Sequence, residues 1–135
     1  NTASIGYRLA FPTTAWAPVL VLNGIAAKQT NTQNRPDLSR NIGGLNVTVF
    51  ALPSNKWGIN VNAGYSKSNY QGQDLLYVAN RTDGLLSVNG TVEYKLTKNW
   101  STRLEVTYFN NQSNLSLYTF QQTTGALKLR YEWDF

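Results

Sequence analysis

The sequence predicts an all-β protein, an antiparallel up-and-down transmembrane β-barrel of which about seven strands are present. The final segment gives the clearest indication of this class. Its odd positions from Leu127 to Phe135 are apolar or aromatic, and its even positions from Lys128 to Asp134 are charged. This alternation gives one strand an apolar face and an ionic face. A strand that separates lipid from an aqueous lumen requires two such faces.

Composition agrees with this class. The 135 residues suffice for one domain, and only 14% of them are charged, against about 25% in ordinary globular domains. No apolar run approaches the roughly 18 residues of a membrane-spanning helix. The mean hydropathy of −0.36 still fits a barrel, because only alternate residues of each strand face lipid. We therefore treat residues 1–135 as a single barrel domain or as the C-terminal segment of one.

The residue types that are missing exclude several functions. The chain has no Cys, Met or His, which excludes disulfides, thiolate metal sites and the histidine bases of most hydrolases. We therefore expect no enzyme activity, no cofactor, no catalytic residues and no metal site. The net charge is +5, but the basic residues are dispersed instead of clustered among aromatic residues. The sequence accordingly predicts no nucleic-acid interface.

Three segments share a pattern in which an apolar residue precedes a short polar turn and a Trp. They are residues 11–16, 52–57 and 96–100, and the fourth Trp lies two positions before the end of the chain. Trp favours the membrane interface, so we expect all four to mark one side of the barrel, and the alternative is four unrelated core tryptophans. Short turns lie on the periplasmic side of such barrels. The predicted interface aromatics are Trp16, Trp57, Tyr94, Trp100, Tyr131, Trp133 and Phe135.

Turn residues and alternation divide the chain into seven strands. They are expected near residues 3–11, 16–28, 41–52, 57–68, 85–96, 100–110 and 119–135, with long polar connections near 29–41, 69–84 and 110–119. Most have the length that a tilted strand needs to cross a bilayer. Two strands have an unclear phase. Residues 16–28 are apolar on both faces. In 41–52, Leu45, Val47, Val49 and Ala51 share one face whereas Phe50 and Leu52 share the other, which a β-bulge near the following turn would reconcile.

Seven strands are an odd number, whereas single-chain bacterial barrels have an even number. Three explanations are open: strands that precede Asn1, a wrong division of residues 1–40, or several chains that build one barrel. We favour the first, a C-terminal part of a larger even-stranded barrel. Open edges in lipid would leave backbone N–H and C=O groups without partners. Upstream strands or another chain must therefore close the barrel.

The charged residues of the strands are expected to face the lumen. The predicted lumen-facing set is Arg8, Glu93, Lys95, Arg103, Glu105, Lys128, Arg130, Glu132 and Asp134. In a narrow barrel these side chains would form a structural ladder of ion pairs, because an unpaired buried charge is unfavourable. Around a wide aqueous lumen they would stay hydrated and act as a selectivity surface for solutes.

The aromatic end resembles the C-terminal sorting and assembly signal of bacterial outer-membrane barrels. Arg81 and Asp83 before a strand, and the segment 113–118 (Ser-Asn-Leu-Ser-Leu-Tyr), are similar to the last four strands of surface lipoprotein assembly modifier barrels and related barrels that follow a tetratricopeptide domain. The likeness covers roughly residues 63–135. It implies a Gram-negative outer-membrane location, recognition of the last strand by the barrel assembly machinery, and a conduit that exports or inserts a macromolecule.

The sequence thus favours an outer-membrane conduit for a solute or a macromolecule. One alternative is a small closed structural or adhesive barrel, without a pore, whose outer loops bind a partner. Another is a soluble ligand-binding barrel of the lipocalin type, with its apolar faces inward and its charges outward. The expected partners of the favoured barrel are the lipid bilayer, the assembly machinery and the strands that complete it.

Overall fold

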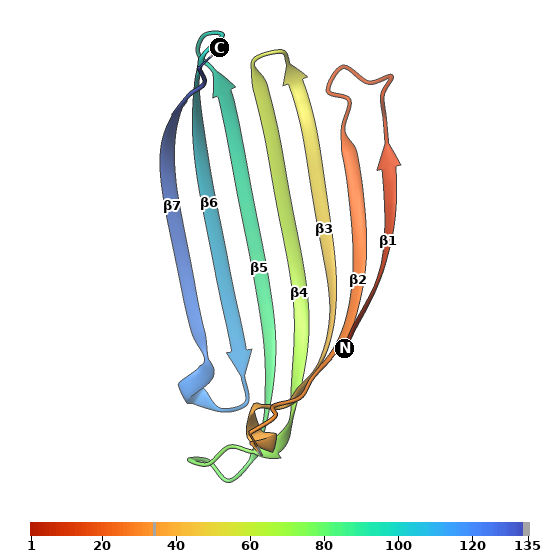
Figure 1. Cartoon of the computed structure of the whole chain (residues 1–135), viewed down its shortest axis with the longest axis vertical. Helices are drawn as coiled ribbons and strands as arrows, with labels where there is room; N and C mark the ends of the chain where they lie inside the picture. Colours follow the sequence, from red (N-terminus) through yellow and green to blue (C-terminus); the bar gives the residue numbers. More distant parts are fainter. Residues whose placement is uncertain (34, 134–135) are drawn as a thin grey trace.

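The computed structural model describes residues 1–33 and 35–133, and it consists of one antiparallel sheet of seven strands (Figure 1). The strands are β1 (Thr2–Ala10), β2 (Val19–Gln29), β3 (Arg40–Ser54), β4 (Trp57–Gln73), β5 (Asn80–Lys95), β6 (Trp100–Ser113) and β7 (Phe120–Tyr131), with the 3-10 turns η1 (Pro36–Leu38) and η2 (Ser116–Tyr118) between them. Each strand pairs with the next along the chain. The predicted all-β, up-and-down class and the number of strands are confirmed.

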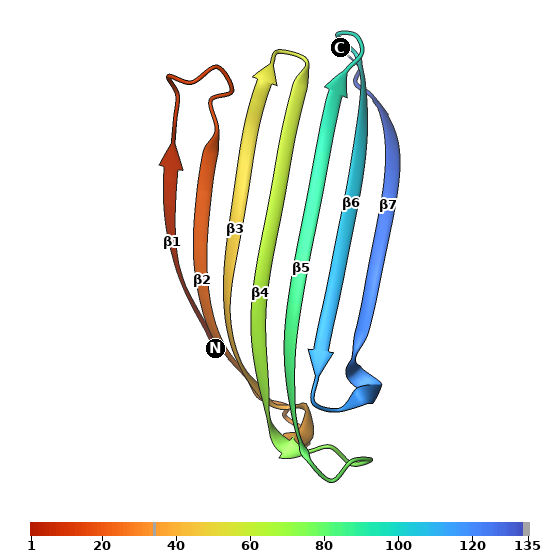
Figure 2. The same cartoon turned by 180° about the vertical axis from the view of Figure 1, so that it is seen from behind.

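Connections of eight, two and four residues join β1 to β2, β3 to β4 and β5 to β6 at one end of the sheet (Figures 1 and 2). Polar side chains shape these turns: the Thr14 hydroxyl donates to the Phe11 carbonyl at 2.9 Å, and the Ser54 hydroxyl accepts the Lys56 N–H at 3.2 Å. Trp57 and Trp100 are the first residues of β4 and β6. We call this end the tryptophan end, and we call the three connections at the other end, 30–39, 74–79 and 114–119, the rim.

Several predicted boundaries are wrong, and β6, for example, ends at Ser113 instead of near residue 110. The connection expected at 69–84 is only 74–79, because β4 continues to Gln73 and β5 begins at Asn80. These extensions carry polar residues on both faces, so their sequence has no alternation that could reveal them. Backbone pairing holds them instead, with Asn69 opposite Thr82. Trp16 was expected at the start of a strand but lies in the connection before β2.

The unclear phase of β3 has a structural explanation. Its pairing with β4 runs in register up to Ala51 opposite Ile59, and then shifts by one residue so that Ser54 lies opposite Trp57. An irregularity of this kind near the turn is what the β-bulge hypothesis required. The shift comes after Ala51, so it bears on Leu52 only and leaves Phe50 on the face opposite Val49, beside its partner in β2, Val19.

The sheet is a single open layer with no conventional core. Ala51 and Leu115 are the only hydrophobic residues that are buried among those described. In the described part of the chain β1 and β7 each pair on one side only, so the sheet is not closed. No helix among the described residues is long and apolar enough to cross a membrane. The large apolar side chains therefore remain exposed unless something outside this chain covers them.

Candidate functional site: two faces and a rim

Pairing places the apolar side chains next to one another on one face of the sheet, which we call the apolar face. Val61, for example, lies between Val49 of β3 and Gly90 of β5. The large residues of this face are Ile5, Tyr7, Leu9, Leu20, Leu22, Leu45, Val47, Val49, Ile59, Val61, Tyr65, Leu86, Val88, Val92, Leu104, Val106, Tyr108, Leu127 and Leu129. Many of them are exposed, so the apolar face is unpartnered within this chain.

The apolar face contains a band without charge. In β4 the band runs from Trp57 to Tyr65, in β5 from Leu86 to Tyr94 and in β6 from Trp100 to Tyr108, nine residues in each strand. Transmembrane strands need about nine to eleven residues to cross the hydrocarbon core. The charged strand residues on this face, Lys28 and Lys67, both lie beyond the band toward the rim.

Aromatic rings gather where the band meets the tryptophan end. Trp57 and Tyr94 lie side by side with ring centroids 4.6 Å apart, and Trp100 and Tyr131 lie 4.8 Å apart. Tyr131 also meets Trp133 edge to face at 4.7 Å. Five of the seven predicted interface aromatics thus form two adjacent clusters. The sixth, Trp16, lies in the turn at the same end, and the seventh, Phe135, is outside the described residues.

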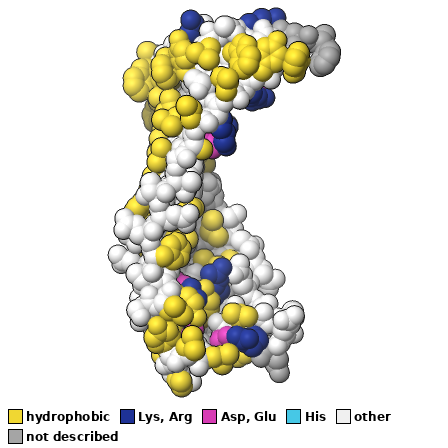
Figure 3. Space-filling view, turned by 90° about the vertical axis from the view of Figure 1, so that its left-hand side faces the viewer, with side chains coloured by type: hydrophobic (Ala, Val, Ile, Leu, Met, Phe, Trp, Pro, Cys, Tyr) yellow, Lys and Arg dark blue, Asp and Glu magenta, His cyan; other side chains and the backbone are white. Residues whose placement is uncertain are grey.

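The charged strand residues other than Lys28 and Lys67 share the opposite face, which we call the polar face. Glu105 pairs with Arg103 at 2.9 Å and with Lys128 at 2.6 Å, and Arg130 pairs with Glu132 at 2.7 Å. The Lys128 and Arg130 side chains remain 58% and 67% exposed. Figure 3 shows the sheet hollowed on one side, with several basic and acidic side chains in the hollow and hydrophobic side chains on the other side.

The sheet therefore brings the predicted lumen residues to one face. Glu93 lies opposite Arg103, and Lys95 lies one pleat beyond Glu93 on the same face. Arg8 shares this face but belongs to β1, six strands away from β7. Asp134 is outside the described residues.

Neutral polar side chains occupy the middle of the polar face. The amides of Asn46 and Asn62 exchange two hydrogen bonds, at 3.0 and 2.8 Å, and Asn62 also donates to the Thr48 hydroxyl at 2.7 Å. On the next pair of strands Asn89 donates to the Thr107 hydroxyl at 2.8 Å. These cross-strand bonds satisfy polar groups without any charge, as a hydrated surface permits.

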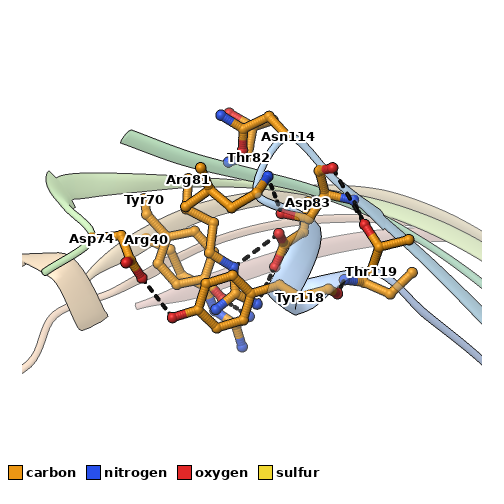
Figure 4. A network of polar contacts seen from close by, with 12 residues as sticks. Arg40, Tyr70, Asp74, Arg81, Thr82, Asp83, Asn114, Tyr118 and Thr119 are labelled. Carbon is orange, nitrogen blue, oxygen red and sulfur yellow. Dashed lines mark hydrogen bonds and ion pairs between the residues drawn. The ribbon is translucent and has the colours of Figure 1, made fainter. Parts of the chain in front are cut away.

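At the rim, one cluster is centred on Arg81 (Figure 4). The guanidinium lies over the ring of Tyr118, 3.4 Å from its centre, and over the ring of Tyr70 at 4.5 Å. Both carboxylate oxygens of Asp83 accept its hydrogen bonds, at 2.9 and 2.5 Å. Cation–π contact and a bidentate ion pair together fix the position of this side chain.

The same cluster ties the rim connections together. The Tyr118 hydroxyl donates to Asp74 at 2.5 Å, which lowers the pKa of the Asp74 carboxyl and raises the pKa of Tyr118. Asn114 accepts the Thr82 N–H at 2.7 Å and donates to the Asn80 carbonyl at 2.8 Å. Hydrogen bonds therefore tie connection 114–119 both to connection 74–79 and to the start of β5.

The third connection packs against β4. A Cβ on Gly72 would lie 2.5 Å from the Asp37 nitrogen and 2.7 Å from the Pro36 carbonyl carbon, so η1 approaches this strand as only glycine allows. The Gln71 N–H donates to the Ser39 carbonyl at 2.9 Å, and Ser39 is buried. The connection 30–39 thus crosses the end of the polar face.

Sequence reasoning singled out Arg81, Asp83, Asn114 and Tyr118 only through a resemblance, and it did not bring them together. Asp74 and Tyr118 are 44 residues apart, and periodicity carries no information about contacts between connections. The Arg-x-Asp spacing was the one local signal, because residues two apart in a strand share a face. Among residues 1–33 and 35–133 no group of three or more acidic side chains could hold a metal ion.

Comparison with known proteins gives no significant match, whether to a family model, to a curated protein or to a solved structure.

Proposed function

We propose that this sheet is part of the wall of a bacterial outer-membrane β-barrel that serves as a conduit for a solute or a macromolecule. The apolar face lies against hydrocarbon, and the polar face lines an aqueous cavity. The tryptophan end faces the periplasm, because it contains the two shortest turns of the sheet, 55–56 and 96–99, and the rim faces outward. The assembly machinery recognises β7, whose alternation resembles the terminal signal of such barrels.

The nine-residue band is the observation that carries this proposal. It spans the length that a tilted strand needs, it has no charge, and interface-type aromatics bound it at the tryptophan end. A water-soluble sheet with one polar face would bury such a band beneath a second layer. The described residues provide no second layer.

The topology specifies what must complete the barrel. All neighbouring strands are antiparallel, so β1 and β7 run in the same direction. Fully antiparallel closure then requires an odd number of further strands between them. A second copy in the same orientation supplies seven strands. At both seams between the two copies, however, β7 of one copy would then pair with β1 of the other in parallel. Strands from elsewhere in the same protein, or from another chain, fit better.

The polar face favours a water-filled conduit over a closed barrel without a pore. An eight-stranded barrel has an interior filled with side chains. Such an interior would bury Lys128 and Arg130, which are more than half exposed here. Lys128 shares the Glu105 carboxylate with Arg103, and Arg130 pairs with Glu132. Burial of imperfectly paired charges is unfavourable, whereas a wide aqueous lumen keeps them hydrated.

Conductance across planar lipid bilayers tests the proposal. The protein that contains these strands should form discrete channels, and a truncated form that lacks the rim connections should conduct at least as well. Insertion into bilayers without any current would instead support the closed structural or adhesive barrel. Stable solubility without detergent would support a soluble barrel with its apolar face inward.

A further inference from the structure

The charges at the tryptophan end of the polar face are separated from those near the rim by a neutral zone. From β3 to β7 the middle of this face carries uncharged residues, such as Asn62, Ser87 and Thr107. Several basic side chains gather at the tryptophan end (Figure 3, top). We call the charged residues of β3–β7 and their turns at that end the basic end, and they are Lys56, Glu93, Lys95, Lys98, Arg103, Glu105, Lys128, Arg130 and Glu132.

Cations outnumber carboxylates in the basic end. Its residues, as defined, are six basic and three acidic. The balance stays positive when Asp134 and a carboxylate at Phe135 are added from the sequence. Arg8, on the polar face of β1, would increase it. The basic end therefore carries a net positive charge.

One row across the strands contains basic residues and no acidic residue. Ser101 of β6 lies opposite Lys95 of β5 and opposite Arg130 of β7. The turn between β3 and β4 continues this row, because the Lys95 N–H donates to the Lys56 carbonyl at 2.9 Å. Directly opposite residues of neighbouring strands have Cβ atoms about 4.5–5.5 Å apart. Three cations thus follow one another along the row, and Ser101 lies between two of them.

The nearby carboxylates leave two of these cations unpaired. Glu132 pairs with Arg130 at 2.7 Å. Neither Lys56 nor Lys95 forms an ion pair with any residue in 1–33 or 35–133. Glu93 lies two residues before Lys95 on the same face, so its single charge can offset only one of the two lysines. Both lysines are exposed, and their charges therefore act on solutes in the adjoining water.

The two lysines line an open hollow. Its volume is about 670 Å³, and Asn55 and Glu93 also line it. A second hollow of about 220 Å³, bordered by Ser101, shares Glu93 and Lys95 with the first. The first hollow has the size of sites that hold small organic molecules. Lys and Arg side chains around an aqueous pore select anions.

We propose that the basic end attracts anions, and that the solute of the conduit is therefore an anion. This inference rests on the proposed function and names the charge class of its solute. Carboxylate or phosphate groups of the solute exchange part of their hydration for the ammonium groups of Lys56 and Lys95. Beyond them the neutral zone offers hydrogen bonds without charge. Binding confined to one end in this way lets the solute leave as well as enter.

A cysteine at position 101 measures the local potential, because the chain has no native cysteine. Ser101→Cys is introduced into the full-length protein in mild neutral detergent. Its thiol is then modified by a negatively and by a positively charged methanethiosulfonate reagent of similar size. The ratio of the two rates cancels the reactivity of the thiolate itself. Ser87→Cys is the matched control, since Ser87 is a half-buried serine of the same face in the neutral zone.

The ratio of anionic to cationic labelling should be about fivefold or more higher in the Ser101 variant at low salt. Adding Lys95→Gln should lower that ratio about three- to tenfold, Lys56→Gln should lower it too, and Glu93→Gln should raise it. Molar salt should remove these differences. Unchanged circular dichroism verifies that each variant is folded. Equal ratios at positions 101 and 87, or a ratio that both lysine substitutions leave unchanged, overturn the inference.

Reversal potentials in planar bilayers separate this inference from the proposed function. Under a gradient of potassium chloride the channels should prefer chloride, and Lys56→Gln combined with Lys95→Gln should shift the preference toward potassium. Channels that prefer potassium overturn the anionic solute and leave the conduit intact. Anion-selective labelling without any current supports the attraction of anions to the basic end and overturns the conduit instead.

Discussion

The guanidinium of Arg81 lies 3.4 Å from the centre of the Tyr118 ring, while the hydroxyl of that ring bonds to Asp74. One tyrosine thus joins the start of β5 to two rim connections. The ring and the hydroxyl make different contributions, and they can be removed separately. The first prediction uses this difference.

Tyr118→Phe keeps the ring over Arg81 but removes the hydrogen bond to Asp74. We expect faster amide hydrogen exchange at Leu76 and Tyr77, whose N–H groups depend on Asp74, with little change in the centre of the strands. Tyr118→Leu should loosen Arg81 as well. Equal exchange in the wild type and both variants would show that the cluster does not hold the connection.

The same contact predicts a pH dependence of the rim. The Tyr118 hydroxyl holds the pKa of Asp74 below its ordinary value of 3.8. A lowered pKa in the folded state means that the contribution of this carboxylate is complete above the unfolded value and is lost as the pH falls through the folded one. The Leu76 and Tyr77 amide signals should therefore shift only below about pH 4, and Asp74→Asn should abolish that shift.

Val78→Gly should stabilise the protein, because Val78 has a φ of 49° and glycine adopts this left-handed conformation without strain. We expect a gain of about 1 kcal/mol in the free energy of unfolding, measured with urea. Ala17, with a φ of 39°, should also gain from replacement by glycine. Ala79→Gly is the control: Ala79 lies in the same connection without a positive φ, so the substitution should give no gain.

A charge introduced on the apolar face tests whether that face contacts the hydrocarbon of a membrane. Leu127 lies at the centre of the band in β7 and is exposed, so Leu127→Arg would be nearly neutral if this face met only water. In hydrocarbon it should destabilise the folded barrel by about 2–4 kcal/mol. Thr124→Arg, on the polar face of the same strand, should have little effect. Similar folding yields of both variants in lipid vesicles would exclude a lipid-facing apolar face.

Gly72 tests the packing of η1. Gly72→Ala places a Cβ against the backbone of Pro36 and Asp37, which cannot move without displacing the connection, so we expect a loss of about 1–3 kcal/mol in urea unfolding. The control is Gly90→Ala, because a Cβ at Gly90 meets nothing within 4 Å. If the two substitutions have the same effect, η1 does not lie against β4.

Glu105→Gln tests whether the polar face is hydrated. The substitution removes the carboxylate that Arg103 and Lys128 share. Around an aqueous lumen these cations stay solvated, so the unfolding midpoint should change little while the reversal potential shifts toward anion preference. A severe loss of folding with no change in selectivity would indicate a narrow, dry interior.

Much of the fold follows from the sequence. Alternation between Trp57 and Tyr65, and again in the strand that ends the chain, fixes which face each residue takes, and turn residues fix the order of the strands. This alternation ends beyond the apolar band. From Ser66 to Gln73 both faces of β4 are mainly polar, so nothing in the pattern separates a strand from a loop.

The rim could not be predicted for a different reason. Its contacts join Arg81, Tyr118 and Asp74 from separate connections, and only the register of the strands brings those connections together. The phase of Phe50 depended on where the register shift falls, which the residues alone leave open. Local patterns thus predict the faces of the sheet, whereas contacts between connections require coordinates.

The length of β4 has a consequence for where the mouth of the proposed barrel would lie. Eight residues of this strand, from Ser66 to Gln73, continue past the uncharged band. At about 3.3 Å per residue this strand would rise roughly 20–26 Å above the hydrocarbon, depending on tilt, and its neighbours β3 and β5 would rise somewhat less. The opening would then lie above the layer of lipid headgroups. Bulky molecules could reach it from the side, and antibodies or proteases should find the rim before they meet the bilayer.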